Sequence, residues 1–227
     1  MDTYNNSRAS RLKQSVQRHG LILTCNRYIY GQLRRILDFE WCRVGSSDDG
    51  AYDWSIAPEG YETRRVTRQE FNDMLCDELI GVDYDSAFER EDLCVASIRD
   101  GKIVGYTFSS VHPTRVRGGL VFKFPERFSY GFASRTAASH RGNKLDRERY
   151  KIRDAEQRRL HGYEVPTVWY VNTMNLEALA VVKQSGSETP FHGYAGYIRC
   201  CGRWITFSSP ASKRFGACFS RDAESED

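Results

Sequence analysis

Arg141-Gly142-Asn143-Lys144-Leu145 is the stretch on which the interpretation of this 227-residue chain depends. It follows a strand-like run at residues 128–136, and it opens a charged segment that we expect to be helical to about Leu160. A strand that ends in an Arg-Gly turn and leads into a helix presents free backbone N–H groups and the positive end of a helix dipole at one point. The sequence therefore predicts an anion site of a kind that suits a pyrophosphate.

The composition is that of a chain able to build a packed core. Hydrophobic residues make up 40% and aromatic residues 13%, so a core can form. The length of 227 residues allows one full domain with an extension or two small domains. The net charge of +3 is too small to indicate nucleic-acid binding. No stretch approaches the roughly 20 apolar residues that a membrane span needs, and no secretory signal pattern is present. We therefore expect a cytoplasmic protein.

The seven cysteines are scattered along the chain, and no pair has the spacing of a zinc site. Reduced cysteines in a cytoplasmic protein are the simplest interpretation. We therefore expect no metal.

A basic amphipathic helix is predicted over residues 11–43. Ile22, Ile29, Leu33 and Ile36 recur at helical spacing, and residues 8–37 contain seven Arg or Lys and no acid. Such a helix either packs on its own domain or meets a membrane surface or an acidic carrier protein. Both alternatives stay open.

A Gly-rich loop at residues 45–60 divides the chain in this interpretation. We expect a basic helical N-terminal extension over residues 1–58 and an α/β domain over residues 59–220. Residues 221–227 then form an acidic, disordered tail. The oligomeric state is left open, with a homodimer as one alternative.

The domain is expected to alternate strands and helices around a central hairpin. Thr67 and Glu70 form a capping-box pattern, and Asp100-Gly101 is a strong hairpin turn. The order predicts a mixed sheet, antiparallel at first and parallel around residues 128–136. Strands are expected at 61–66, 93–99, 102–108, 128–136, 167–171, 194–200 and 203–207, helices at 67–79, 142–160 and 175–183, and an irregular insert at 112–127.

Three motifs over residues 61–207 together resemble those of the GCN5-related N-acetyltransferase (GNAT) family. The hairpin Cys94–Phe108 resembles the family's second and third strands, and its segment Asp100–Tyr106 has the family's usual sequence pattern there. Residues 136–145 resemble its acyl-CoA pyrophosphate motif, and residues 171–186 resemble its strand-to-helix turn. The resemblance implies an α/β fold with a mixed, splayed β-sheet flanked by helices.

The same resemblance implies an N-acyltransferase that moves an acetyl or other acyl group from acyl-CoA to an amine by direct attack. Acetyl-CoA is the expected co-substrate, and a small amine or an amino sugar is the expected acceptor. The implied cofactor-binding residues are Ser134, Arg135 and Thr136 for pantetheine, Arg141, Gly142, Asn143, Lys144, Leu145 and Asp146 for the pyrophosphate, and Asn175 for the pantetheine arm.

Acyl transfer to an amine needs groups that move protons. Tyr170, Asn172 and His140 are the candidate catalytic residues, because they lie on or beside the elements that would line the splay. A histidine titrates near neutral pH, which suits a base. The alternatives are a loop histidine beside the phosphates and a half-buried tyrosine that only packs. Weaker candidates are Tyr130, Tyr194, Tyr197, Glu126 and Glu188.

The chain also departs from the family pattern. Lys144 and Asp146 stand where small residues are usual, and Val182 stands where the family often has a tyrosine. These departures keep two alternatives open: an enzyme that uses a longer-chain or carrier-protein donor, and a non-catalytic GNAT-like binding module. Nucleic-acid binding is not expected, because oppositely charged i,i+4 neighbours such as Asp154 and Arg158 indicate that the basic 141–160 helix is a solvated one.

Overall fold

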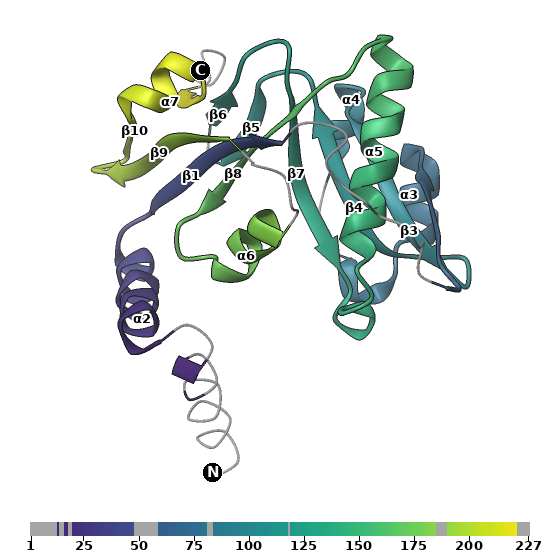
Figure 1. Ribbon diagram of the computed structural model, residues 1–227, viewed down its shortest axis with the longest axis horizontal. Helices are drawn as coiled ribbons and strands as arrows, with labels where there is room; N and C mark the ends of the chain where they lie inside the picture. The colour runs from purple at the N-terminus through teal and green to yellow at the C-terminus, as the bar shows by residue number, and fades with distance from the viewer. Residues whose placement is uncertain are drawn as a thin grey trace.

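An extended sheet with helices against it organises the molecule (Figure 1). The computed structural model describes residues 13, 16–17, 20–47, 59–80, 84–117, 119–184 and 190–221. The described strands are β1 (Phe39–Ser47), β2 (Glu62–Arg65), β3 (Leu93–Arg99), β4 (Lys102–Ser110), β5 (Thr114–Arg117), β6 (Leu120–Lys123), β7 (Ser129–Thr136), β8 (Thr167–Asn172), β9 (Phe191–Cys200), β10 (Arg203–Ser208) and β11 (Cys218–Arg221).

The helices flank this sheet. The described α-helices are α2 (Leu21–Ile36), α3 (Arg68–Met74), α4 (Asp85–Glu89), α5 (Leu145–His161), α6 (Leu176–Gln184) and α7 (Pro210–Phe215), and short 3-10 turns span Asp77–Leu79 and Ala138–His140.

Eight of the described strands form one sheet in the order β10-β9-β1-β8-β7-β4-β3-β2. β5, β6 and β11 form a separate three-stranded sheet. In the large sheet β7 and β8 run parallel, whereas the other pairs are antiparallel. The predicted mixed α/β architecture is confirmed.

Two local predictions are confirmed at atomic level. Asp100 and Gly101 both have positive φ, at 50° and 73°, as a two-residue hairpin turn between β3 and β4 requires. The capping box at α3 is complete, because the Thr67 hydroxyl accepts from the Glu70 N–H at 3.3 Å and the Thr67 N–H donates to the Glu70 carboxylate at 2.8 Å.

The predicted N-terminal division is wrong for residues 38–47. The helix α2 ends at Ile36, and β1 then lies between β8 and β9, antiparallel to both. β1 therefore belongs to the same sheet as the strands beyond residue 59. The cause is a change of period, since Cys42 and Val44 are buried while Trp41 is exposed, which is the alternation of a half-buried strand. Residues 1–12, 48–58 and 222–227 lie outside the described residues.

α2 lies beside the sheet rather than on it (Figure 1). Its link to the sheet includes a ring contact of Tyr30 with Phe39, at 4.8 Å between centroids. Leu21, Ile29 and Leu33 are exposed, so the described part of the chain does not cover this apolar face. No helix in the described residues is long and apolar enough to cross a bilayer.

The other differences from the predicted elements are local. The helix expected to reach residue 79 ends at Met74, and the insert at 112–127 contains β5 and β6. With β11 these strands cover one face of the large sheet. The core on that face consists of Cys42, Val44, Leu120, Phe122, Phe124, Phe128, Tyr130, Val168, Ala195, Tyr197, Ala217 and Phe219.

The central position of β1 predicts how it responds to a buried charge. Val44 is fully buried, so Val44→Asp should lower the free energy of unfolding by roughly 3 kcal/mol or more, as expected for an unpaired carboxylate in an apolar core. Trp41→Asp, on the exposed face of the same strand, should cost about 1 kcal/mol. Urea denaturation followed by circular dichroism measures both. Equal losses in the two variants would contradict the placement of β1.

Candidate functional site

β7 and β8 separate after a short paired segment. They pair only at Ser129 with Thr167 and at Tyr130 with Val168, and β7 then continues to Thr136 while β8 continues to Asn172. Their outer edges stay paired, with β4 along β7 and with β1 along β8. The inner backbone edges at residues 131–136 and 169–172 therefore face a gap without ladder partners, which is the arrangement that an extended, amide-bearing ligand can enter.

A β-bulge lies at this gap. Tyr106 of β4 is opposite Arg135, but Phe108 is opposite Phe132, so one extra residue of β7 sits between the two pairs. Ala133, inside the bulge, has a positive φ of 53°. A bulge leaves a residue outside the ladder and redirects the backbone beside it. Backbone polar groups near Ala133 and Ser134 are thus available at the point where the strands part.

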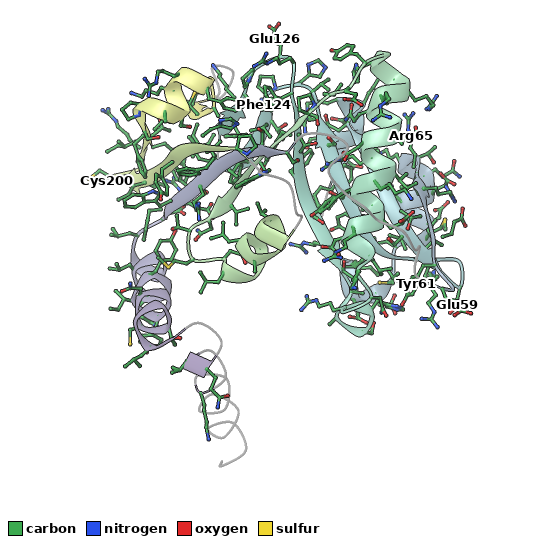
Figure 2. The ribbon with its side chains drawn as sticks, viewed as in Figure 1. Glu59, Tyr61, Arg65, Phe124, Glu126 and Cys200 are labelled. Atoms are coloured by element: carbon green, nitrogen blue, oxygen red, sulfur yellow. The ribbon has the colours of Figure 1, made fainter. Side chains whose placement is uncertain are left out.

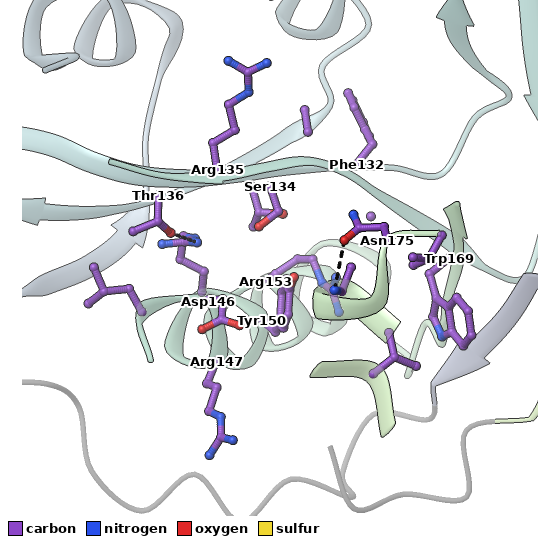
Figure 3. A pocket seen from close by; sticks show the side chains of 18 of the residues that line it. Phe132, Ser134, Arg135, Thr136, Asp146, Arg147, Tyr150, Arg153, Trp169 and Asn175 are labelled. Atoms are coloured by element: carbon purple, nitrogen blue, oxygen red, sulfur yellow. Dashed lines mark hydrogen bonds between the residues drawn. The ribbon is translucent and has the colours of Figure 1, made fainter. Parts of the chain in front are cut away.

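A cavity of about 990 Å³ lies between the parted strands and α5. Figure 3 shows Ser134 and Thr136 pointing from β7 toward α5, whereas Arg135 points to the opposite face of the sheet. The predicted site residues that line the cavity are Ser134, Arg135, Thr136, His140, Arg141, Gly142, Lys144, Leu145, Asp146, Tyr170, Asn172 and Asn175.

Asn143 is the predicted residue that does not line the cavity. Its amide group donates to the His140 carbonyl at 3.0 Å and to the Tyr61 hydroxyl at 3.2 Å. The Tyr61 hydroxyl also bonds His140 Nδ1 at 3.0 Å and accepts from Arg99 at 3.0 Å. These hydrogen bonds hold the Asn143 side chain against Tyr61 and His140, and they fix the orientation of the His140 ring.

The turn leaves the N-terminus of α5 open toward the cavity. Gly142 and Lys144 have positive φ, at 87° and 56°. Lys144 is the N-cap residue and makes no side-chain cap, so the first N–H groups of α5 are not covered by a capping side chain. Lys144 stands where the family pattern has a small residue, and its backbone is left-handed. The turn therefore keeps a shape that favours glycine, although a lysine occupies it.

Cations from this turn and from α5 line the cavity. The cationic residues on this side of the cavity are Arg141, Lys144, Arg147, Arg149 and Arg153. The acidic lining residues among the described ones are Glu40, Glu78 and Asp146. The excess of positive charge, added to the helix dipole, favours a polyanionic ligand.

Two of these arginines lie beneath the cavity, against glycines of the sheet. Arg149 is fully buried and donates to the Thr136 hydroxyl at 2.9 Å. A Cβ on Gly105 would lie 2.4 Å from its Nη1, and a Cβ on Gly131 would lie 2.8 Å from Nη1 of Arg153. Glycines in β4 and β7 thus make room for two guanidinium groups. Sequence analysis did not predict this packing, because the sequence does not show which side chain fills the space beside a glycine in a strand.

Unpartnered polar atoms show that the cavity suits a polar ligand. Thr107 Oγ1, Arg149 Nε and Trp169 Nε1 are buried without a hydrogen-bond partner, and all three residues line the cavity. Such atoms normally have a partner in a native structure. The described residues contain no group of three or more His, Cys, Asp or Glu side chains placed to hold a metal.

The two candidate catalytic residues of β8 have different partners. Tyr170 stacks on Tyr130, with 5.3 Å between the ring centroids. Burial is the main cause that raises the pKa of both phenols, so both keep their protons at neutral pH. The Asn172 amide donates to the Tyr30 hydroxyl at 2.8 Å and to Glu40 at 3.0 Å.

Glu40 is the residue that sequence analysis missed. It comes from β1, lines the cavity, and also accepts from the Tyr197 hydroxyl at 2.6 Å. No local pattern marked it, since residue 40 was assigned to a helix remote from the site. The two glutamates that were considered do not replace it: Glu126 lies at the opposite end of the molecule from Tyr61 (Figure 2), and Glu188 lies outside the described residues.

A second cavity of about 320 Å³ opens on the other side of β7, between α4 and β5. Tyr130, Phe132, Ala133 and Tyr170 line both cavities. The two cavities therefore approach each other where β7 and β8 part.

The remaining sequence candidates are placed elsewhere: Tyr194 is exposed, and Tyr197 is buried in the core. Val182 lines the larger cavity at the position where the family pattern has a tyrosine.

Comparison with known proteins gives only distant likenesses. No family model matches the chain, and no curated protein is significantly similar. Solved structures that resemble it include a Drosophila protein (15% identity, TM-score 0.47, covering 78% of this chain and 57% of that one). A tandem GNAT protein from the clavulanic acid biosynthesis pathway (17%, 0.46, 77% and 54%) and a GCN5-related N-acetyltransferase from Kribbella flavida (12%, 0.43, 75% and 58%) also resemble it.

This chain spans little more than half the length of each of these three proteins. TM-scores below 0.5 carry no weight for function. The interpretation of the site therefore rests on the parted strands, the bulge and the cations.

The glycine–arginine packing predicts a matched pair of stability effects. Gly105→Ala should lower the free energy of unfolding by about 1–3 kcal/mol, because its Cβ would press on the buried guanidinium of Arg149. Gly31→Ala, in open space on α2, should leave the stability unchanged or raise it by up to about 1 kcal/mol. Chemical denaturation measures both changes. An unchanged midpoint for Gly105→Ala would contradict this packing.

Proposed function

We propose that this protein is an acyl-CoA-dependent N-acyltransferase of the GNAT type, with acetyl-CoA as its donor. The observation that carries the proposal is the gap between β7 and β8, which opens onto an uncapped, cation-rich helix N-terminus. The gap and the helix end offer, side by side, what an acyl-CoA needs: amide partners for its pantetheine arm and an anion site for its pyrophosphate.

Each part of the cavity then has a role. The backbone edge at Ser134–Thr136 pairs with the amides of the pantetheine arm, in the way that a peptide adds to an open sheet edge. Arg141, Lys144 and the first N–H groups of α5 hold the pyrophosphate. Asn175 caps α6 by accepting from the Ala178 N–H at 3.2 Å, and this cap fixes its side chain at the cavity wall.

The reaction is the attack of an amine on the thioester carbonyl. A C–N bond forms, the C–S bond breaks, and the nitrogen loses a proton while the departing thiolate gains one. We assign stabilisation of the oxyanion to a backbone N–H at the bulge around Ala133. The buried phenols of Tyr130 and Tyr170 stay protonated, so they are donors and not bases.

Glu40 is the proposed proton acceptor. The other two acidic lining residues are committed to the pyrophosphate end, because Glu78 accepts from Ser139 and Asp146 lies in the first turn of α5. Glu40 instead receives hydrogen bonds from Asn172, which ends β8 and lines the cavity, and from Tyr197 of β9. Asn172 is accordingly a positioning residue, and His140 supports the pyrophosphate turn.

The pyrophosphate assignment is tested by reversing one charge. Arg141→Glu should weaken acetyl-CoA binding at least about tenfold, since a charge-assisted hydrogen bond contributes roughly 1.5–3 kcal/mol. Isothermal titration calorimetry measures the dissociation constant. The matched control is Arg158→Glu, a charge reversal of an exposed arginine in the last turn of α5, which should leave the affinity unchanged.

Two outcomes would contradict this assignment. Equal affinities of wild-type protein and Arg141→Glu would remove Arg141 from the pyrophosphate site. Absence of acetyl-CoA binding to the wild-type protein would remove the proposed function itself.

The role of Glu40 is tested by an uncharged isostere. Glu40→Gln should lower kcat by a factor of about 10²–10⁴, the usual contribution of a general base. The affinity for acetyl-CoA should stay at the wild-type value, because Glu40 is assigned to the amine and not to the donor. Steady-state kinetics on the best amine of a panel measures the effect, with exposed Glu126→Gln as control. A wild-type kcat in Glu40→Gln would show that the base lies elsewhere.

A further inference from the structure

The smaller cavity has two positively charged side chains on a wall that is otherwise uncharged. Its lining residues among the described ones include two arginines, Arg90 from the end of α4 and Arg115 from β5, and no Asp or Glu. Its volume of about 320 Å³ is at the lower end of the range of small-molecule sites. A small anionic molecule fits this combination of size and charge.

The guanidinium group of Arg90 is fixed in position and has a hydrogen-bond donor available for an anion. Its Nη2 is 2.6 Å from Asp92 Oδ2, and the Asp92 side chain is only 1% exposed. This ion pair fixes the plane of the guanidinium. The Nε of Arg90 is buried without a hydrogen-bond partner. A buried charged donor without an acceptor is costly, and an acceptor atom from a ligand in the cavity would remove that cost.

The other walls of the cavity are flat and aromatic. Tyr84 comes from the start of α4, Tyr130 and Phe132 come from β7, and Tyr170 comes from β8. Aromatic walls bind flat apolar groups by edge and stacking contacts. They also stand at the parting of β7 and β8, so a group held between them lies next to the proposed acyl-transfer point.

We propose that this cavity selects an amine that also carries a carboxylate and an aromatic body, that is, an aromatic amino acid or a close chemical equivalent. The inference rests on the proposed function and deepens it by giving the acceptor class. Arg90 and Arg115 bind the carboxylate, and the aromatic walls hold the ring. The same two cations disfavour a nearby ammonium ion, so they raise the fraction of neutral amine that is able to attack. An amino sugar supplies neither the carboxylate nor the ring.

Matched amines test the carboxylate directly. L-tyrosine differs from tyramine by one carboxylate, and L-phenylalanine differs from phenethylamine in the same way. For the wild-type protein we expect kcat/KM with acetyl-CoA to be at least about tenfold higher for each amino acid than for its amine, as one charge-assisted contact allows. Equal values, or a preference for the amines, would overturn the proposal.

Variants of Arg90 and Arg115 test whether these residues cause the preference for an amine that carries a carboxylate. Arg90→Gln should reduce the ratio of the two kcat/KM values toward one while the dissociation constant of acetyl-CoA stays unchanged. Arg90→Lys keeps a cation beside Asp92 and so guards against a folding defect, but it lacks the Nε donor, and it should lose most of the preference. Arg115→Gln, at an exposed position, should reduce it partly. Retention of the full ratio in all three variants would overturn the assignment.

A binding measurement separates this inference from the proposed function. Titration of L-tyrosine and tyramine into the wild-type protein without acetyl-CoA should show tighter binding of L-tyrosine, by at least about tenfold. This result supports the carboxylate-binding site even if acetyl-CoA does not bind, an outcome that would refute only the acyltransferase. If acetyl-CoA binds but neither compound prefers the carboxylate form, the acceptor class is wrong and the acyltransferase stands.

Discussion

The feature on which the rest of the structure depends is the short ladder between β7 and β8. The two strands share only two residue pairs, and each is then held by a different neighbour, β7 by β4 and β8 by β1. Because both outer edges are paired along most of their length, the inner edges part without unravelling the sheet. Every proposed function of the site follows from that parting: an open backbone edge, a bulge at its base, and two cavities that approach each other through it.

The position of α5 on the sheet beside the gap follows from the glycine–arginine contacts. Gly105 and Gly131 leave space on the sheet surface for the guanidinium groups of Arg149 and Arg153. This packing uses polar groups where most helices use leucine or isoleucine, and it holds the helix through hydrogen bonds to Thr136 and, from Gln157, to Ser109. The same arginines add positive charge beneath the cavity. The residues that fix the helix thus also prepare the site for an anion.

Much of the fold could be predicted from local signals, because turns and caps need particular residues. Asp100-Gly101 and the Thr67–Glu70 box are such cases, and the structure has both. β1 could not be predicted, because the helical spacing upstream runs into it without a Gly or Pro to mark the change. Glu40 was missed for the same reason, since it reaches the site through strand pairing between residues far apart in the sequence. The second cavity depends on tertiary packing alone.

The central claim is that acetyl-CoA pairs with the open backbone edge of β7. Hydrogen–deuterium exchange of the amides at residues 133–136, with and without saturating acetyl-CoA, tests it most directly. Pairing with the pantetheine arm should slow exchange there by at least about tenfold, because each protected amide must first lose a hydrogen bond. Amides of the β3–β4 hairpin, already paired in the sheet, should exchange at the same rate in both samples. Unchanged exchange at residues 133–136 in a protein that binds acetyl-CoA would contradict the account.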